Sequence, residues 1–472
     1  MFKNLDEALA YIQENDIQLV DLKFCDLWGR WHHVTLTTRE INAELMRSGV
    51  GFDGSSVGFK SVKSGDMALI PDLSTGFEDP FTEHPTLSFL CNIIEADTKE
   101  PFTLDPRQMV LRAEAYMKTL GVADSTLWGP EFEFYIFDSV RTHNGINSAA
   151  YSVDSIEASW NSDEDSDGYA IPIHGGYHAI PPRDRLADLR SEMVLVLESI
   201  GVPVKYHHHE VGGPGQCEIE TPLLGMLAAG DASMIIKYVT KMAAAQTGQS
   251  ATFLPKPLFG EAGSGMHFHQ QLIKGGKNAF YDSKGPFLLS QTALFYIGGL
   301  LKHAPAVLAL TNPSTNSYRR LVPGFEAPVN AFFSPGNRSA AIRVPKYATE
   351  PNQVRFEFRP PDATCNPYFA LVAQLMAGLD GIRHKIDPTA EGFGPIDDDI
   401  FSWTPEQRAT IKSLPTSLDD ALDALESDHD FLTVGGVCPV EMIKTWTTAK
   451  RKESMALRTR PHPFEIEMYY DL

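Results

Sequence analysis

Charged and aromatic residues alternate in the segment RFEFR at residues 355–359. Because successive side chains of a β-strand point to opposite faces of its sheet, a strand here would place three charges on one face and two phenylalanines on the other. The same alternation occurs at residues 131–134 (EFEF) and 218–220 (EIE). A buried charge is unfavourable unless it is paired or bound to a metal. Three such strands therefore predict a cleft that holds a metal ion or a polyanionic ligand.

Five carboxylates and one imidazole on these and neighbouring predicted strands could bind metal ions. They are Glu131, Glu133, Glu210, Glu218, Glu357 and His267. Mg²⁺ and Mn²⁺ prefer oxygen ligands and accept an imidazole, whereas a structural zinc site needs thiolates or several histidines. The set is large enough for two ions, so we expect two Mg²⁺ or Mn²⁺ ions in one site.

Arginines are concentrated in the part of the chain that carries the last of these acids. They are Arg319, Arg320, Arg338, Arg343, Arg355 and Arg359. A guanidinium group binds the oxygens of carboxylates and phosphates in a two-point geometry. Two metal ions beside an arginine cluster are typical of phosphoryl transfer. The chain contains no Walker A sequence, so a bound nucleotide would need another phosphate-binding device.

Two parts of the chain with different secondary structure are expected to position these residues. Residues 1–103 are predicted to form a small β-rich domain, with strands over 17–24 and 30–36. Asp105 and Pro106 supply the N-cap and first-turn proline of a helix that begins the second domain, residues 104–472.

The second domain mixes elements without a regular alternation of strands and helices, which predicts an α+β fold. Helices are expected over 106–120, 184–200, 226–246 and 366–386, and strands over 252–258 and 266–273. Residues 141–176 form a polar stretch without periodicity, which predicts a long functional or flexible loop. The apolar segment 293–310 is interrupted by Lys302, His303 and Pro305, and we expect it to be a core helix and not a membrane span.

The composition excludes some partners. The chain of 472 residues has 40 basic and 61 acidic residues and a net charge of -21, which argues against nucleic acid or an anionic membrane as the main partner. Its five cysteines are scattered, and acidic residues near the N-terminus argue against a signal peptide. We therefore expect a cytoplasmic protein.

A set of long motifs, in the same order along the chain, resembles type I glutamine synthetases. The motifs are FDGSS at 52–56, GPEFE at 129–133, HHEV at 208–211, KPLFG at 256–260, GSGMH at 263–267, NSYRRLVPGFEAP at 316–328, NRS at 337–339, RFEFRPPD at 355–362 and NPY at 366–368. The resemblance covers essentially the whole chain. It implies a β-grasp-like N-terminal domain and a large α/β catalytic domain.

In that family, the side-chain carboxylate of glutamate attacks the γ-phosphate of ATP, and ammonia then displaces phosphate from the acyl phosphate to give glutamine. The resemblance implies that Glu133, Glu210 and Glu218 hold one metal ion. The second ion would be held by Glu131, His267 and Glu357.

The resemblance also assigns roles to residues that contact the substrates. Arg320, Arg359 and Gly263 would bind glutamate, whereas Arg338, Arg343 and Arg355 would face phosphate. Nucleotide contacts are implied for His208 and His269. The ammonium pocket would contain Asp53, which also removes a proton, with Ser56 and Tyr177, and Glu326 would close a flap over the site.

Two further properties follow from the resemblance. The family is typically a dodecamer of two stacked hexamers whose active sites lie between subunits, and the tail with Tyr469 and Tyr470 resembles the tether between the rings. The tyrosine that some members adenylylate corresponds to Phe401, which has no hydroxyl to modify. Control by adenylylation at this position is therefore not expected.

Several positions around the site depart from the usual pattern of the family. They are Lys205 in place of an acid, Leu223 in place of a phenylalanine, Ala262 in place of an asparagine, Gln271 in place of a serine and Asn352 in place of a lysine. These changes leave open an alternative in which glutamate is ligated to an amine other than ammonia. Ammonia remains the favoured acceptor because Asp53, Tyr177 and Glu326 are all retained.

Overall fold

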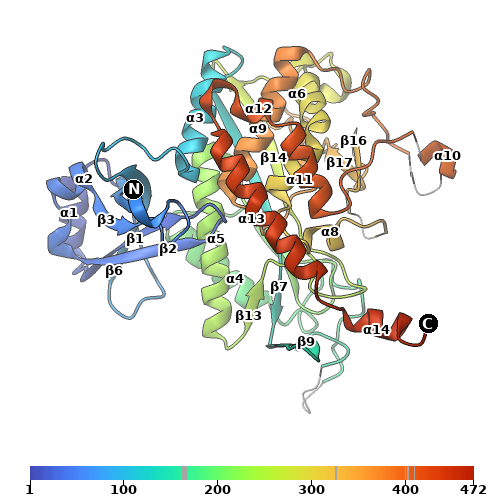
Figure 1. The fold of residues 1–472 in the computed structure, drawn as a ribbon, viewed down its shortest axis with the longest axis horizontal. Helices are drawn as coiled ribbons and strands as arrows, with labels where there is room; N and C mark the ends of the chain where they lie inside the picture. Colours follow the sequence, from blue (N-terminus) through green and yellow to red (C-terminus); the bar gives the residue numbers. More distant parts are fainter. Residues whose placement is uncertain (162–166, 325–326, 399, 401–402, 409) are drawn as a thin grey trace.

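The computed structural model describes residues 1–472 except 162–166, 325–326, 399, 401–402 and 409. The chain contains two large sheets, of which the N-terminal one lies near one end of the longest axis in Figure 1 and the other lies toward the middle of the molecule. The predicted Glu326 and Phe401 lie outside the described residues. The mixture of helices and strands confirms the α+β fold class.

The N-terminal part is built on a six-stranded sheet with the order β2-β1-β6-β4-β3, in which β5 also pairs with β6. Strand β1 is antiparallel to β2 and parallel to β6, while β4 is antiparallel to both β6 and β3. The strands are β1 (Leu19–Cys25), β2 (Trp31–Thr37), β3 (Val50–Asp53), β4 (Asp66–Pro71), β5 (Phe77–Glu78) and β6 (Thr86–Glu95), with helices α1 (Leu5–Glu14) and α2 (Ala43–Ser48).

The helix α3 (Pro106–Thr119) leads into the second part of the chain. The Asp105 side chain caps it by accepting a hydrogen bond from the amide of Arg107, as the sequence predicts. This cap is completely buried, and burial raises the pKa of Asp105 to about 6.

The second part contains a ten-stranded sheet with the order β10-β11-β7-β14-β18-β17-β16, to which β12 and β13 add on β7 and β15 on β14. All pairs are antiparallel except β16 with β17. The strands are β7 (Ser125–Phe137), β10 (Tyr206–His209), β11 (Gln216–Glu220), β12 (Leu224–Gly225), β13 (Ser250–Thr252), β14 (Met266–Lys274), β15 (Lys277–Asn278), β16 (Asn330–Ser334), β17 (Ala340–Arg343) and β18 (Phe356–Phe358).

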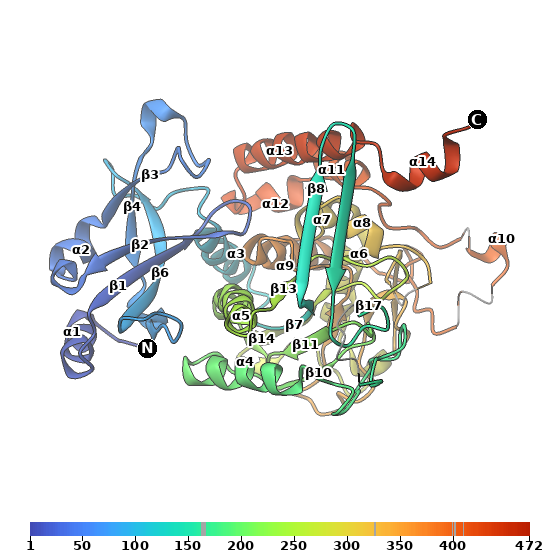
Figure 2. The ribbon, with the colours of Figure 1, turned by 90° about the horizontal axis from the view of Figure 1, so that it is seen from below.

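Helices cover one side of this sheet. The buried helix α9 (Pro367–His384) packs against α3, α5, α6, α7 and α12. The other helices are α4 (Ala187–Ser199), α5 (Met226–Gln246), α6 (Gln291–Lys302), α7 (Ala304–Thr311), α8 (Ser317–Arg320), α10 (Pro405–Arg408), α11 (Leu418–Ser427), α12 (Asp430–Thr433), α13 (Val440–Arg458) and α14 (Pro463–Tyr469). Figure 2 shows that α13 and α11 lie together on the outer side of this layer.

The predicted core segment 293–310 is two helices instead of one. Helices α6 and α7 meet at His303 at an angle of 72°, because Pro305 lies in the first turn of α7 and cannot continue a helix from α6. Both helices are largely buried. Among the described residues, no single helix is long and apolar enough to cross a membrane. The bent pair of α6 and α7 reaches the necessary length and apolar composition only when the two helices are taken together.

Two other predicted segments need correction. The loop prediction for 141–176 is wrong in its first part, because β8 (Ser139–Asn144) and β9 (Ala149–Asp154) form an antiparallel hairpin that pairs with neither large sheet (Figure 2). The predicted strand 252–258 is wrong after Thr252, where β13 ends. Pro255 and Pro257 follow, and proline has no amide to donate to a sheet.

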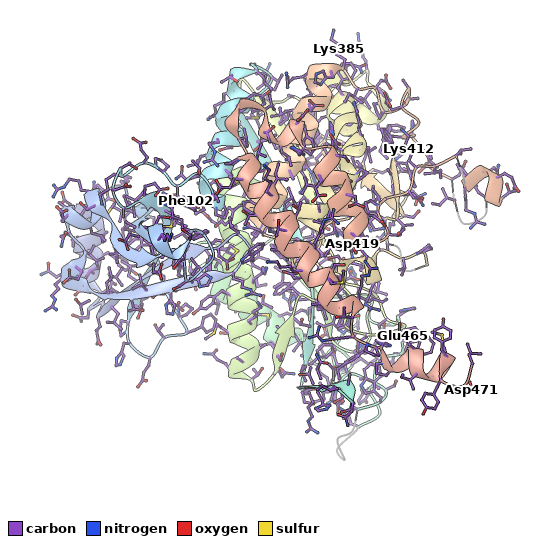
Figure 3. The ribbon with its side chains drawn as sticks, in the orientation of Figure 1. Phe102, Lys385, Lys412, Asp419, Glu465 and Asp471 are labelled. Atoms are coloured by element: carbon purple, nitrogen blue, oxygen red, sulfur yellow. The ribbon has the colours of Figure 1, made fainter. Side chains whose placement is uncertain are left out.

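The C-terminal residues extend from the body of the protein. Helix α14 carries Glu465, and Asp471 follows it at the end of this extension (Figure 3). The tail leaves its large apolar side chains exposed, with Tyr470 83% and Leu472 96% accessible. The predicted docking of this tail therefore has no partner within the described residues.

Candidate active site

The register of the large sheet brings the predicted metal ligands together. Glu131 on β7 lies opposite Glu220 on β11 and opposite His267 on β14. In the same way, Glu133 lies opposite Glu218. Residues directly opposite each other in antiparallel strands share one face of the sheet, so the acids of β7 and β11 form a continuous ionic surface.

The other face of the same strands is apolar. Phe132 and Phe134 on β7 are completely buried, as are Phe356 and Phe358 on β18. This face belongs to the main hydrophobic core, which includes residues of the covering helices. The phenylalanines therefore fix the orientation of the strands, and the alternating acids must point to the opposite face.

Glu357 is completely buried in the middle of β18 and lies between two arginines. Its carboxylate accepts hydrogen bonds from Arg343 and from Arg359. Burial alone would raise the pKa of Glu357, but the guanidinium groups of Arg359 and Arg343 outweigh it and lower this pKa to about 2. Glu357 is therefore ionised at neutral pH and could serve as a metal ligand. The strand is shorter than predicted: it covers 356–358, and Arg355 and Arg359 lie just outside its two ends.

Two groups of three residues have ligand atoms within 4.8 Å of one another and could hold metal ions. One group is Glu131, His267 and Glu357. The other consists of His208, Glu210 and Glu218. Carboxylate oxygens with one imidazole form a donor set that suits Mg²⁺ or Mn²⁺.

Glu133 lies next to the second group. It is opposite Glu218 in the sheet, and its carboxylate accepts a hydrogen bond of 2.6 Å from the amide of Gly265. His208 occupies the position in this group that the sequence assigns to Glu133, and its Nε2 lies 3.4 Å from Glu218.

The acids of the second group lie in an environment that disfavours their charge. Burial raises the pKa of Glu210 well above its ordinary value, and the charges of Glu133 and Glu218 raise it further. Burial and the charges of Glu131 and Glu133 have the same effect on the pKa of Glu218. A divalent cation would relieve this repulsion, so the metal-free geometry fits a cation site.

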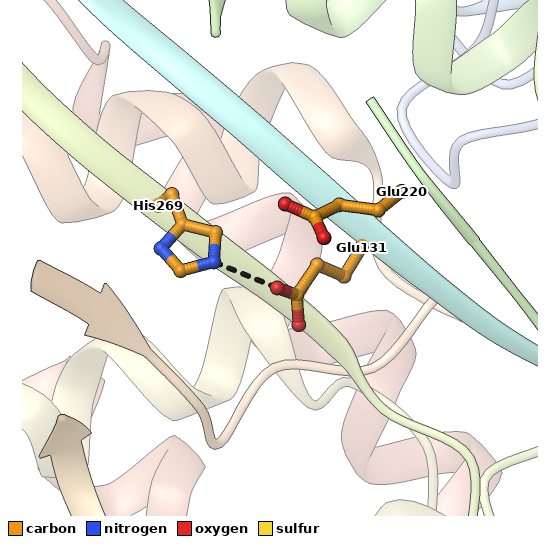
Figure 4. A group of neighbouring side chains, drawn as sticks. All are labelled: Glu131, Glu220 and His269. Carbon is orange, nitrogen blue, oxygen red and sulfur yellow. Dashed lines mark hydrogen bonds and ion pairs between the residues drawn. The ribbon is translucent and has the colours of Figure 1, made fainter. Parts of the chain in front are cut away.

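A third group, Glu131, Glu220 and His269, was not predicted as a group from the sequence (Figure 4). Nε2 of His269 lies 2.7 Å from Glu131, and Glu220 points toward the same carboxylate. One oxygen of Glu220 has no hydrogen-bond partner in the part of the chain that the structure describes. The alternation at 218–220 was the only sequence signal for Glu220.

Arg320 supplies positive charge at the edge of the acidic surface. Its guanidinium donates hydrogen bonds to the carbonyl of Pro360 and to that of Arg359, and no ion pair joins it to a carboxylate among the described residues. A Cβ atom at Gly263 would lie 2.7 Å from the Arg320 side chain, so this position requires glycine. The guanidinium thus remains available for an anionic ligand.

Most of the predicted site residues line one cavity of about 410 Å³. Its lining includes Glu131, Glu133, Tyr177, His208, Glu210, Glu218, Gly263, His267, Arg320, Arg338, Arg343 and Arg359. Glu357 and His269 lie directly behind this lining, where both are in contact range of Glu131 or His267. Arg355 instead donates a hydrogen bond to the carbonyl of Gln353 and lies over the ring of Tyr347.

Asp53 and Ser56 do not line this cavity. Asp53 ends β3 in the N-terminal sheet, and its carboxylate accepts hydrogen bonds from the hydroxyls of Ser55 and Ser56. These hydrogen bonds lower the pKa of Asp53, which is otherwise solvent-exposed. Within one chain, Asp53 and Ser56 are therefore separate from Tyr177, the third residue of the predicted ammonium pocket, which lines the cavity.

Four of the five departures from the family pattern make contacts in or near the site. Lys205 forms an ion pair of 2.6 Å with Glu220, so a lysine appears where it can neutralise this buried acid. Gln271 donates a hydrogen bond to the carbonyl of Asn352. Ala262 lines the cavity, where its carbonyl accepts a hydrogen bond from Tyr135.

Comparisons with known proteins agree with this arrangement. The family models of the glutamine synthetase beta-Grasp domain and catalytic domain match residues 16–96 and 103–469. Glutamine synthetases of Frankia alni and Streptomyces coelicolor are 47% and 48% identical to this chain, and each comparison covers 100% of both proteins.

Solved structures support the same relationship. The glutamine synthetase of Plasmodium falciparum has a TM-score of 0.88 at 28% identity and covers 99% of each chain. A GmaS/ADP complex has a TM-score of 0.82 at 26% identity and covers 100% of each chain. The resemblance read from the motifs is thereby confirmed, and the chain belongs to the glutamine synthetase family, whose reaction is the ATP-dependent ligation of ammonia to glutamate.

Proposed function

We propose that this chain forms L-glutamine, ADP and phosphate from L-glutamate, ammonia and ATP in the cavity described above, through a γ-glutamyl phosphate. The observation that carries this proposal is the meeting of an acidic, metal-binding surface with Arg320 and Arg359 in one cavity. Transfer of a phosphoryl group to a carboxylate requires both the metal ions and the arginines. The anionic phosphates of ATP must approach the anionic carboxylate of glutamate, and these cations offset the repulsion between them.

Two Mg²⁺ or Mn²⁺ ions would complete the acidic surface. One would be held by Glu133, Glu210 and Glu218, and the other by Glu131, His267 and Glu357. When bound, such ions neutralise the phosphate charge that develops during transfer. The two arginines that contact Glu357 hold its carboxylate in place, so this ligand needs no reorganisation when the ion binds.

Cationic side chains would position the two anionic substrates. Arg320, Arg359 and Gly263 are assigned to glutamate, because they lie together at one edge of the cavity. Arg338, Arg343 and Arg355 are assigned to phosphate, with Arg338 as the residue that stabilises the transferred group. His208 and His269 are assigned to the nucleotide, and the existence of a structural relative in complex with ADP supports nucleotide binding by this chain.

The ammonium pocket would form only in an oligomer. Asp53 and Ser56 lie outside the cavity of their own chain, so we assign them to the site of a neighbouring subunit, where they would meet Tyr177. Asp53 would take a proton from ammonium, and its lowered pKa keeps it ionised for this task. Glu326 would close the site over the bound substrates. The assembled protein would be a dodecamer and would be located in the cytoplasm.

Replacement of a metal ligand tests the proposal. We expect Glu218→Gln to reduce glutamine formation by at least about 100-fold, because loss of a ligand costs both metal affinity and geometry. The matched control is Glu192→Gln, which changes an exposed carboxylate on α4. The measurement is glutamine formed at saturating ATP, glutamate, ammonium and Mg²⁺. Full activity of Glu218→Gln would contradict the assigned site.

A further inference from the structure

A second groove, which shares no lining residue with the active-site cavity, lies where the turn between β1 and β2 meets α5 and α13. It has a volume of about 700 Å³. Four cationic and three aromatic side chains line it, namely Arg30, Lys237, Lys241, Lys450, Trp28, Trp31 and Tyr238. In a protein with a net charge of -21, this concentration of positive charge is unusual.

The positive charge of the groove is poorly compensated. Glu453 is the only acid in the lining, and it is paired with Lys450 at 3.0 Å. Within the described ranges, no ion pair joins a carboxylate to Arg30, Lys237 or Lys241. Lys237 and Lys241 also lie one turn apart on α5, where two like charges destabilise a helix.

The aromatic side chains form the walls of the groove. Trp28 stacks on Trp446 with ring centroids 5.5 Å apart, and Trp31 lies 5.7 Å from Tyr238. Lys450 is 92% buried and its ammonium lies over both rings of the Trp28–Trp446 pair, at 5.6 and 5.1 Å. Flat aromatic faces beside ammonium groups suit a ligand that combines a planar ring with negative charge.

The turn that carries Trp28, Arg30 and Trp31 is held in a fixed position. Asn366 donates hydrogen bonds to the carbonyl oxygens of Asp26 and Leu27. Gly29 has a φ of 79°, and a Cβ atom there would lie only 2.8 Å from Asn366. The groove is therefore preorganised and does not depend on a mobile loop.

We propose that this groove binds a small anion that carries a planar ring, such as an aryl or heteroaryl phosphate. The ring stacks against Trp31 and Trp28, and the phosphate oxygens accept hydrogen bonds from Arg30 and from one of the two lysines, Lys237 or Lys241, while the other lysine lies beside the ring. Because these residues come from both the N-terminal sheet and the helices of the second part, the ligand ties the two parts of the chain together.

Pyridoxal 5′-phosphate is a suitable probe because it carries a planar ring, a phosphate and an aldehyde. The aldehyde condenses with a neutral lysine amine to an imine and releases water, and borohydride then reduces the C=N bond and fixes the label. Burial lowers the pKa of both Lys237 and Lys241, and the charge of Lys237 lowers that of Lys241 further, so the neutral amine is more populated at these two lysines than at an exposed lysine.

The experiment maps labelled lysines by mass spectrometry on the intact, assembled protein. We expect Lys237 or Lys241 to be labelled at a probe concentration about tenfold lower than exposed Lys302, since a charge-assisted phosphate contact contributes about this factor. Pyridoxal, which lacks the phosphate, should show no such preference. Pyridoxine 5′-phosphate, which lacks the aldehyde, should protect both lysines.

Two arginine variants complete the test. Arg30→Gln should abolish the preference for the phosphate-bearing probe, whereas Arg39→Gln, an exposed arginine outside the groove, should retain it. Equal labelling by pyridoxal would overturn the proposal, because a lowered lysine pKa would then explain the reactivity. An unlabelled groove in the assembled protein, or an unchanged preference in Arg30→Gln, would overturn it as well.

Discussion

At the scale of single residues, the charge of Glu131 is balanced by its neighbours. Burial would raise the pKa of Glu131, but His269 and His267 outweigh it and hold this pKa well below its ordinary value. Glu220 repels the charge of Glu131, because ligand atoms of Glu131, Glu220 and His269 all lie within 4.8 Å of one another. Burial and the charge of Glu131 raise the pKa of Glu220, and the charge of His269 together with the ion pair to Lys205 offsets part of this rise.

We predict that Glu220→Gln stabilises the metal-free protein and weakens its binding of Mg²⁺. At an effective dielectric constant of about 20, two charges at this separation repel by about 3 kcal/mol, of which Lys205 offsets a part. We expect a net gain of about 1 kcal/mol in stability without metal and a few-fold loss of Mg²⁺ affinity. Thermal unfolding with and without Mg²⁺ measures both effects.

The control for this change is Glu192→Gln, which removes an exposed carboxylate. Glu192→Gln should change neither the stability of the metal-free protein nor its affinity for Mg²⁺, because an exposed charge interacts weakly with the site. If Glu220→Gln destabilises the metal-free protein, then the carboxylate of Glu220 is satisfied by Lys205 and does not repel Glu131.

At the scale of elements, the break between α6 and α7 carries a titratable contact. The imidazole of His303 lies 2.9 Å from Asp380 on α9 and 2.7 Å from Asp428 after α11. Burial would lower the pKa of His303, but hydrogen bonds to these two carboxylates outweigh it and raise this pKa. The stability from this contact is therefore full below about pH 6.5 and is lost as the pH rises through the folded-state pKa.

We predict that His303→Gln removes part of the decrease in stability above pH 6.5. The wild-type protein should lose about 1 kcal/mol relative to the variant as the histidine becomes neutral, or roughly 2 °C in the unfolding midpoint. Thermal unfolding between pH 6 and pH 9 measures the difference. The control His84→Gln, at an exposed position, should show the same dependence of the unfolding midpoint on pH as the wild type. If the midpoints of His303→Gln and of the wild type change with pH in parallel, the prediction is wrong.

The regularity of its sequence pattern decides whether a helix or strand can be predicted from the sequence. Helix α5 has the predicted bounds 226–246, because its apolar period is long and regular. The hairpin of β8 and β9 escaped prediction because its strands are mostly exposed on both faces and show no alternation. Strand β18 has only three residues, and its central Glu357 pairs with Arg343 and Arg359, contacts that depend on the register of the sheet.

At the scale of the whole molecule, the motifs predicted the family and its chemistry, but not the neighbours of each residue. The pairing of Lys205 with Glu220 and the place of His208 beside Glu218 follow from the register of β10, β11 and β7. A single sequence does not encode this register in any local pattern. The roles assigned to Asp53 and Ser56 remain predictions, because one chain does not bring them to the cavity.

We predict that subunits with complementary defects restore activity when they are mixed. Asp53→Ala and Glu357→Ala oligomers should each be inactive, because each lacks one half of every site. If Asp53 acts on the neighbouring subunit, then random co-assembly in equal amounts should complete about one quarter of the sites. The measurement is glutamine formation after dissociation and reassembly of the mixture. No recovery in oligomers that contain both variants would show that the sites are not shared.

The most direct test of the central claim compares acceptors for the activated glutamate. Phosphate release from ATP would be measured with glutamate and Mg²⁺ in the presence of ammonium, methylamine, ethanolamine or a polyamine, each over a range of concentrations. We predict that kcat/KM is highest with ammonium and that phosphate release matches glutamine formation. A strong preference for an organic amine would contradict ligation of ammonia as the function of this chain.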